Sequence, residues 1–127
     1  MAQELQLYLE QLPDRLRKPV SEELRRQADR LADAQRARAA RHVKTGKTLA
    51  SIRVEQGRDD LTFFVRAGGE ATTKEVRKGS GVDFDIALAQ EFGTVNMAAI
   101  PFFFPPFRAL RDDMEEQIAA AVTDALK

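Results

Sequence analysis

The sequence predicts a single α+β domain, and three observations lead to that prediction. Apolar residues recur at helical spacing towards both ends of the chain, two short runs near its middle alternate apolar and polar residues, and no linker-like stretch divides it. A length of 127 residues is usual for one domain. We therefore expect residues 1–127 to form an N-terminal helix, an antiparallel β-hairpin, a short helix and a long C-terminal helix.

The N-terminal third predicts two helical segments. Leucines stand at helical spacing in the first dozen residues, namely Leu5, Leu9 and Leu12. Pro13 should end or kink this short first helix, because proline lacks the backbone donor that a helix interior needs. Ser21 is a suitable N-cap for the main helix, which should run to about Val43.

The middle of the chain predicts a hairpin. Thr45 is positioned to cap a single helical turn, after which Ile52 to Gln56 alternate as in a strand. The polar run 57–60 is typical of a turn. Residues 61–67 alternate again, so they should form a second strand antiparallel to the first.

Residues 68–82 are rich in glycine and charge and show neither periodicity, which predicts a long mobile loop. Residues 83–92 then favour a short helix that ends at Gly93, because glycine is the commonest residue just past a helix end. A short strand is the alternative for this segment.

The last helix is predicted to begin at Pro105 and Pro106, which suit a first turn. Its apolar residues keep to one arc: Phe107, Leu110, Met114, Ile118, Ala121, Val122 and Ala125. The acidic residues of this segment fall on the opposite side.

The charges are unevenly distributed although the net charge is zero. Arg15 to Lys47 holds 11 basic and 4 acidic residues, whereas Asp83 to Lys127 holds 3 basic and 8 acidic ones. This distribution predicts an electrically two-ended molecule, which suits head-to-tail association between subunits at least as well as it suits nucleic-acid binding.

The sequence offers no constellation that would carry catalysis. His42 is the one histidine, there is no cysteine, and neither Ser51 nor Ser80 lies in a nucleophile or phosphate-binding motif. We therefore expect no enzyme activity, metal, cofactor or small-molecule substrate. The longest apolar stretch, Met97 to Phe107, is too short and too rich in proline for a membrane span.

A basic segment provides an alternative function, that of a small DNA-binding protein. Five cations of residues 36–47 lack carboxylates at helical pairing distance, and they are the candidate DNA-facing residues: Arg36, Arg38, Arg41, Lys44 and Lys47. A solvated or subunit-facing surface is the competing interpretation of the same segment.

Residues 101–106 form a proline-rich connector between two predicted helices and contain three phenylalanines. If this connector is extended, Phe102 and Phe104 face one way and Phe103 the other. Phe102 would then belong to the core, and Phe103 would face a second layer or another chain. Glu91 is either an exposed helix-end carboxylate or one partner of an ion pair between subunits.

Three stretches in this order resemble a family of bacteriophage proteins. They are Thr45 to Ile52 (TGKTLASI), Ile86 to Thr94 (IALAQEFGT) and Met97 to Phe102 (MAAIPF), followed by a further proline and a long helix. The pattern is similar to the tail-completion or head-tail joining family of long-tailed phages, also described as minor tail components of lambdoid phages. The resemblance extends from about Val20 to the C-terminus.

The resemblance implies a structural virion protein at the neck or tail top, assembled in the host cytoplasm. It implies a ring of identical subunits that contacts the tail terminator, the tail tube or the head-tail connector, with genomic DNA passing through the channel. The candidate subunit-interface residues are Glu91, Phe92, Gly93, Thr94, Met97, Phe103, Arg77 and Lys78. Such a protein would use neither a membrane nor a small-molecule substrate.

Overall fold

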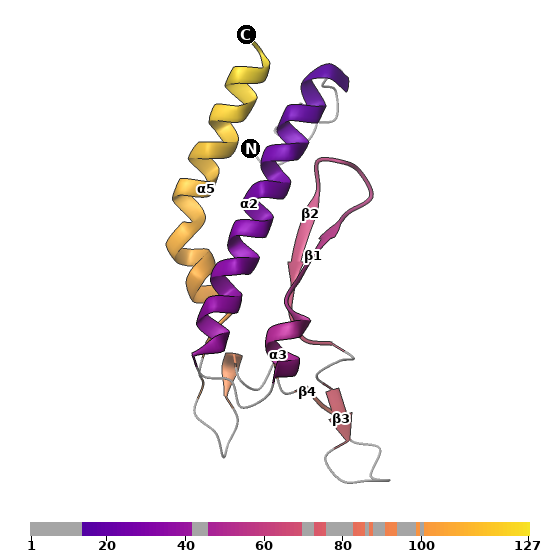
Figure 1. The fold of residues 1–127 in the computed structure, drawn as a ribbon, viewed down its shortest axis with the longest axis vertical. Helices are drawn as coiled ribbons and strands as arrows, with labels where there is room; N and C mark the ends of the chain where they lie inside the picture. The colour runs from indigo at the N-terminus through magenta and orange to yellow at the C-terminus, as the bar shows by residue number, and fades with distance from the viewer. Residues whose placement is uncertain are drawn as a thin grey trace.

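The computed structural model describes residues 14–41, 46–69, 73–75, 83–85, 87, 91–93, 99 and 101–127. The helices whose bounds lie within this part of the chain are α2 (Asp14–Ala40), α3 (Gly46–Ser51) and α5 (Phe104–Ala125). The strands are β1 (Arg53–Gln56), β2 (Phe63–Arg66), β3 (Thr73–Glu75) and β4 (Asp83–Asp85). The predicted α+β class is confirmed (Figure 1).

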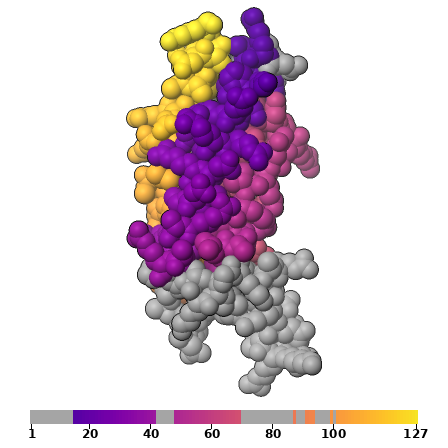
Figure 2. Space-filling view, in the orientation of Figure 1, coloured from indigo at the N-terminus to yellow at the C-terminus, as the bar shows by residue number. Residues whose placement is uncertain are grey.

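Helix α2 is the centre of the molecule. It lies between α5 on one side and the β1–β2 hairpin on the other, and α5 runs antiparallel to it (Figure 1). The space-filling view shows α2 along the front of the molecule, flanked by α5 and the hairpin (Figure 2). Each flanking element is therefore supported mainly by a different side of one long helix.

The start of α2 differs from the prediction. The helix begins at Asp14, so Pro19 and Ser21 both lie inside it, and the prediction of Ser21 as N-cap is wrong. Pro19 removes one backbone hydrogen bond from the helix. Val20, beside it, is only 1% exposed, and burial of such a side chain offsets the loss. The helix ends at Ala40, earlier than the expected Val43.

The predicted β1–β2 hairpin is confirmed. Val54 pairs with Val65 in an antiparallel register, and the backbone N–H of Gly57 donates to the carbonyl of Thr62 at 2.7 Å. A Cβ on Gly57 would lie 2.8 Å from the Thr62 side chain, so only glycine fits this close approach. The outer face carries Phe64, over whose ring the Arg66 guanidinium lies at 4.7 Å.

A second antiparallel pair, β3 with β4, replaces part of the predicted loop and of the predicted short helix. Lys74 lies opposite Phe84 in its register. Residues 73–75 were expected within the 68–82 loop, and for them that prediction is wrong. For residues 83–85 the predicted helix is wrong, and the alternative of a short strand is confirmed. Strands of three residues are too short to give a legible alternating pattern, and cross-strand pairing decides their structure.

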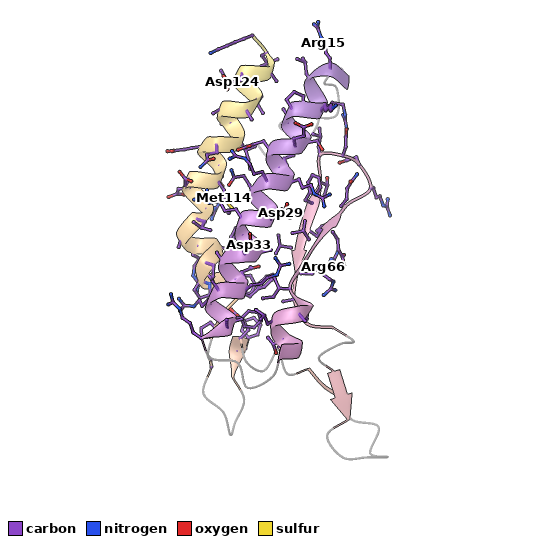
Figure 3. The ribbon with its side chains drawn as sticks, viewed as in Figure 1. Arg15, Asp29, Asp33, Arg66, Met114 and Asp124 are labelled. Carbon is purple, nitrogen blue, oxygen red and sulfur yellow. The ribbon has the colours of Figure 1, made fainter. Side chains whose placement is uncertain are left out.

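Helix α5 is confirmed, with both prolines in its first turn. Met114 is buried and lies on the side of α5 that faces α2 (Figure 3). Polar contacts also join the two helices alongside Met114. Arg30 forms an ion pair with Asp113 at 2.6 Å, and the Gln27 amide donates to Gln117 at 3.0 Å.

The antiparallel helix pair overturns the prediction of an electrically two-ended molecule. Arg15, near the start of the basic helix α2, and Asp124, near the end of the acidic helix α5, lie at the same end of the pair (Figure 3). The basic and acidic halves of the sequence therefore lie side by side along the molecule. Their charges meet across the α2–α5 contact, as in the Arg30–Asp113 pair.

Acidic pH should weaken the charged contact between α2 and α5. A hydrogen bond from the Arg30 guanidinium, followed by one from the Gln117 amide, lowers the pKa of Asp113 from its ordinary value of 3.8. A carboxylate whose pKa is lower in the folded than in the unfolded state adds stability above its unfolded pKa, and the stability is lost as pH falls through the folded pKa. The free energy of unfolding should therefore fall below about pH 4.

Urea unfolding of the natural chain and of Asp113→Asn at neutral and acidic pH measures this contribution. The variant should be less stable near neutrality and should lose less stability on acidification, because it has one fewer such carboxylate to protonate. Asp112→Asn is the matched control, since Asp112 is exposed and forms no ion pair with a described residue. An Asp113→Asn profile parallel to that of the natural chain would contradict the expected coupling.

Candidate interaction site at the start of helix α5

Glu91 caps the start of α5 from a distant position in the sequence. One carboxylate oxygen accepts the backbone N–H groups of Phe102 at 2.9 Å and Phe103 at 2.8 Å, and the other accepts that of Phe104 at 3.2 Å. The N-cap residue itself, Phe103, has no capping side chain. A carboxylate here satisfies free backbone donors and lies at the positive end of the helix dipole.

Glu91 is held in this place by a turn of the backbone. Glu91 and Phe92 are helical, and Gly93 follows with a φ of +79°, in the left-handed region that glycine adopts readily. The prediction that Gly93 ends a helical segment is thus confirmed. Glu91 is buried, with 8% of its surface exposed. It is therefore not the exposed helix-end carboxylate that was one of the two expectations.

Helix α2 fixes the connector that precedes α5. The side-chain amide of Gln35 donates to the carbonyl of Phe103 at 2.8 Å, and Nε of Arg38 donates to the carbonyl of Pro101 at 2.9 Å. Gln35 is completely buried, and its own side-chain oxygen has no partner among the described residues. The connector is thus bonded to Glu91 through its N–H groups and to α2 through its carbonyls.

We call the backbone segment that Glu91, Gln35 and Arg38 hold in place the mount. The phenylalanines next to it have either buried or exposed rings. Phe102 is 2% exposed and packs in the core with Ala32, Ala39, Ile52 and Ala87. Phe103 is half-buried against the same core, and its ring meets that of Phe104 edge to face at 5.2 Å. The core position predicted for Phe102 is confirmed.

Two rings of this site are exposed to solvent. Phe92 is 64% exposed and Phe104 40% exposed, and their centroids lie 6.1 Å apart. The predicted shared orientation of Phe102 and Phe104 is wrong, because Phe104 is already the first residue of α5 and the chain is not extended there. We call Phe92 and Phe104 the exposed phenylalanine pair.

A hollow of about 240 Å³ lies beside this pair. Ala67 and Ala87 contribute its small side chains, and Glu91 and the four phenylalanines at 92 and 102–104 complete the described lining. The Glu91 carboxylate is already occupied by three backbone donors, so the lining is mainly apolar. Such a surface favours an apolar side chain of a partner over a charged ligand.

Ser51, the last residue of α3, is hydrogen-bonded to the backbone that follows β2. Its hydroxyl donates to the carbonyl of Thr48 at 2.6 Å and accepts the backbone N–H of Gly68 at 2.9 Å. Both Thr48 and Ser51 are buried. The TGKTLASI stretch therefore contributes a structural junction, whereas the sequence indicated only a helical turn there.

Two of the five candidate DNA-facing residues form contacts within the chain that the sequence did not predict. Arg36 forms an ion pair with Asp33 at 3.0 Å and also donates to the carbonyl of Ile52, while Arg38 is bonded to Pro101. Arg41 is exposed and forms no ion pair with a described residue. Lys44 and the side chain of Lys47 lie outside the described residues.

The candidate subunit-interface residues are divided in the same way. Glu91, Phe92, Gly93 and Phe103 come together at the start of α5. Thr94, Met97, Arg77 and Lys78 lie outside the described residues, as does His42. The structure thus joins the central part of the predicted interface into one site.

The described residues contain no group of three or more histidine, aspartate or glutamate side chains placed to hold a metal ion. Within the same part of the chain, neither long helix has a stretch apolar enough to cross a membrane. Comparisons with protein-family models, with curated protein sequences and with solved structures found no match.

Sequence reasoning missed the capping role of Glu91. One signal was present: the connector before α5 offers no serine, threonine, aspartate or asparagine at the N-cap position. A helix start without a local capping side chain needs a hydrogen-bond acceptor from elsewhere in the chain. Glu91 is the acidic residue that precedes this connector most closely, so the missing cap could have indicated Glu91 as the acceptor.

Proposed function

We propose that this protein is a structural assembly component of a phage, prophage or phage-like particle, acting at the head-tail interface as a tail-completion or head-tail joining subunit. The observation that carries the proposal is the exposed phenylalanine pair on a mount fixed by Glu91, Gln35 and Arg38. The mount coincides with the EFG and PF stretches on which the family resemblance rests. The surface is therefore rigid, apolar and made from the motif residues.

A rigid apolar surface suits association between subunits. Large exposed aromatic side chains are enriched where proteins bind one another, and a preorganised backbone lowers the entropy lost on binding. We propose that identical subunits form a ring, and that Phe92 inserts into the neighbouring subunit. The proposed partners beyond the ring are the tail terminator, tail tube or head-tail connector. The proposed role involves no covalent chemistry.

Replacing Phe92 with serine tests this surface. The change should leave the monomer folded, because the ring is 64% exposed, but should weaken self-association. Light scattering across protein concentration should show the natural chain rising above the 14.2 kDa mass of one subunit and the Phe92→Ser chain remaining at it.

Phe64→Ser is the matched control. Phe64 is 43% exposed on the β1–β2 hairpin, away from the start of α5, so its loss removes a similar exposed ring from a different surface. Equal loss of association in both variants would contradict a specific role for Phe92. A natural chain that stays at the mass of one subunit at every concentration would contradict self-association.

DNA binding through residues 36–47 is the second candidate, supported by the exposure of Arg38 and Arg41 at one end of α2. It has less support, because Arg36 and Arg38 already bond within the chain. Salt-dependent binding to duplex DNA that is lost in the Arg38→Ala, Arg41→Ala double variant would favour it. Absence of binding at low salt would remove it.

A further inference from the structure

The free edge of strand β2 borders an apolar groove. The groove has a volume of about 360 Å³ and is lined by residues of α2, of β2 and of α5. Leu31, Phe63, Val65, Met114 and Ile118 are among the lining residues. No residue of β1 is among the described ones, so the groove lies on the side of β2 that β1 does not occupy.

The hairpin register shows which backbone groups lie on this free edge. The N–H of Gly57 donates to the carbonyl of Thr62, and hydrogen-bonded pairs alternate along the hairpin from there. This alternation points the N–H and C=O groups of Phe64 towards β1. It points those of Phe63 and Val65 away from β1, and no described residue forms a backbone hydrogen bond with them.

We propose that the groove binds an extended segment of a partner protein, which adds a third strand to the sheet at the free edge of β2. Unpaired backbone groups on a strand edge bond readily to an added strand, and pockets beside the edge take its alternate side chains. Phe63 and Val65 provide the backbone groups here. Helix α5 extends about 16 Å between Phe107 and Ile118, a length that corresponds to about five residues of an extended chain.

The groove also defines the chemistry of the segment. Arg111 and Glu115 are the charged residues of the described lining, and they form an ion pair with each other at 3.2 Å. The described lining therefore offers no unpaired charge, and a charged group placed against its apolar side chains would lose hydration without compensation. The segment should accordingly carry uncharged apolar side chains at alternate positions.

The size of the groove favours one strand of a different protein over a second copy of this chain. A groove about 16 Å long is too small for a whole folded surface, since stable association buries roughly 800 Å² on each partner. The described strands are already paired, β1 with β2 and β3 with β4, so a second copy offers no described strand that is free to be added.

This groove shares no described lining residue with the hollow beside the exposed phenylalanine pair. The inference therefore does not depend on the proposed role in particle assembly.

Amide hydrogen exchange of the full natural chain, followed by NMR, tests the proposal. The amides of Phe63 and Val65 should exchange at least about tenfold faster than that of Phe64, which points towards β1. The probe is a synthetic peptide in which three valines alternate with threonines between terminal lysines. It should slow exchange at Phe63 and Val65 by about tenfold or more. Exchange that the peptide leaves unchanged would overturn the proposal.

Two N-methylated peptides distinguish strand addition from simple apolar contact. One is methylated on the valine amides and the other on the threonine amides, so each keeps its side chains but loses the donors along one edge. An added strand bonds to β2 through one edge only, so one of the two peptides should bind at least about tenfold more weakly than the other. Equal affinities would contradict strand addition.

Ile118→Lys places the peptide in the groove. The change puts a charge into the apolar lining and should weaken peptide binding by about tenfold. Ala119→Lys is the matched control, since Ala119 is exposed and outside the described lining, and it should leave binding unchanged. Equal effects of the two substitutions would show that the peptide binds elsewhere.

Exchange in the free natural chain identifies any other occupant without a substitution. Slow exchange at Phe63 and Val65 at every protein concentration would assign the free edge to the chain itself. Slow exchange that appears only at high concentration would assign it to a second copy. Either result would rule out the proposed partner.

Discussion

Replacing Phe102 with alanine will lower the free energy of unfolding by about 3 to 5 kcal/mol. The ring is 2% exposed and is the largest side chain of the cluster formed with Ala32, Ala39, Ile52 and Ala87. Three of its four partners in this cluster are alanines, whose short side chains cannot extend into the space left behind. Urea or thermal unfolding followed by circular dichroism measures the change.

Phe92→Ala is the control for this prediction. It removes the same atoms from a ring that is 64% exposed, so it should alter the free energy of unfolding by no more than about 0.5 kcal/mol. The two variants together distinguish the Phe102 ring, which stabilises the core, from the Phe92 ring, which is proposed to contact a neighbouring subunit. Similar destabilisation by both substitutions would show that this division is wrong.

Replacing Glu91 with alanine will cost about 2 to 4 kcal/mol, from the loss of a helix cap and from backbone donors left without an acceptor. The three N–H groups concerned belong to Phe102, Phe103 and Phe104, and the first is buried. The change should also make the backbone that carries the exposed phenylalanine pair less rigid. Both the stability of the monomer and its self-association should therefore decrease.

Glu91→Gln distinguishes capping from charge. Its amide keeps one acceptor oxygen but loses the negative charge at the positive end of α5, so its stability should lie between those of the natural chain and Glu91→Ala. Glu116→Ala, on the exposed face of α5, is the control and should change stability by no more than about 0.5 kcal/mol. An unchanged stability in Glu91→Ala would contradict the capping role.

Local sequence patterns predicted the elements whose signals extend over many residues. The arc of apolar residues gave the extent of α5, and alternation around Gly57 gave the β1–β2 hairpin. The start of α2 was wrongly predicted at Ser21, whereas the helix begins at Asp14. Ser21 is a good capping residue, but the burial of Val20 on the longer helix outweighs that preference. Propensity at a single position is a weaker effect than the packing of a whole helical face.

The candidate site was predicted only in part. Its motif residues were correctly placed next to the start of α5, but the orientation of each side chain depended on contacts across the fold. Glu91 reaches backbone donors 11 to 13 residues away, and Arg38 reaches a carbonyl 63 residues away. No periodicity in the sequence encodes such distances.

The sequence by itself determined the α+β class, the hairpin and the last helix, because helical and strand periodicities arise from neighbouring residues. Tertiary structure alone decided that the basic and acidic halves lie side by side, that β3 pairs with β4, and that Glu91 caps α5. It also decided which phenylalanines remain exposed. These features depend on residues far apart in the chain, whose proximity is fixed only when α2 brings α5 and the hairpin together.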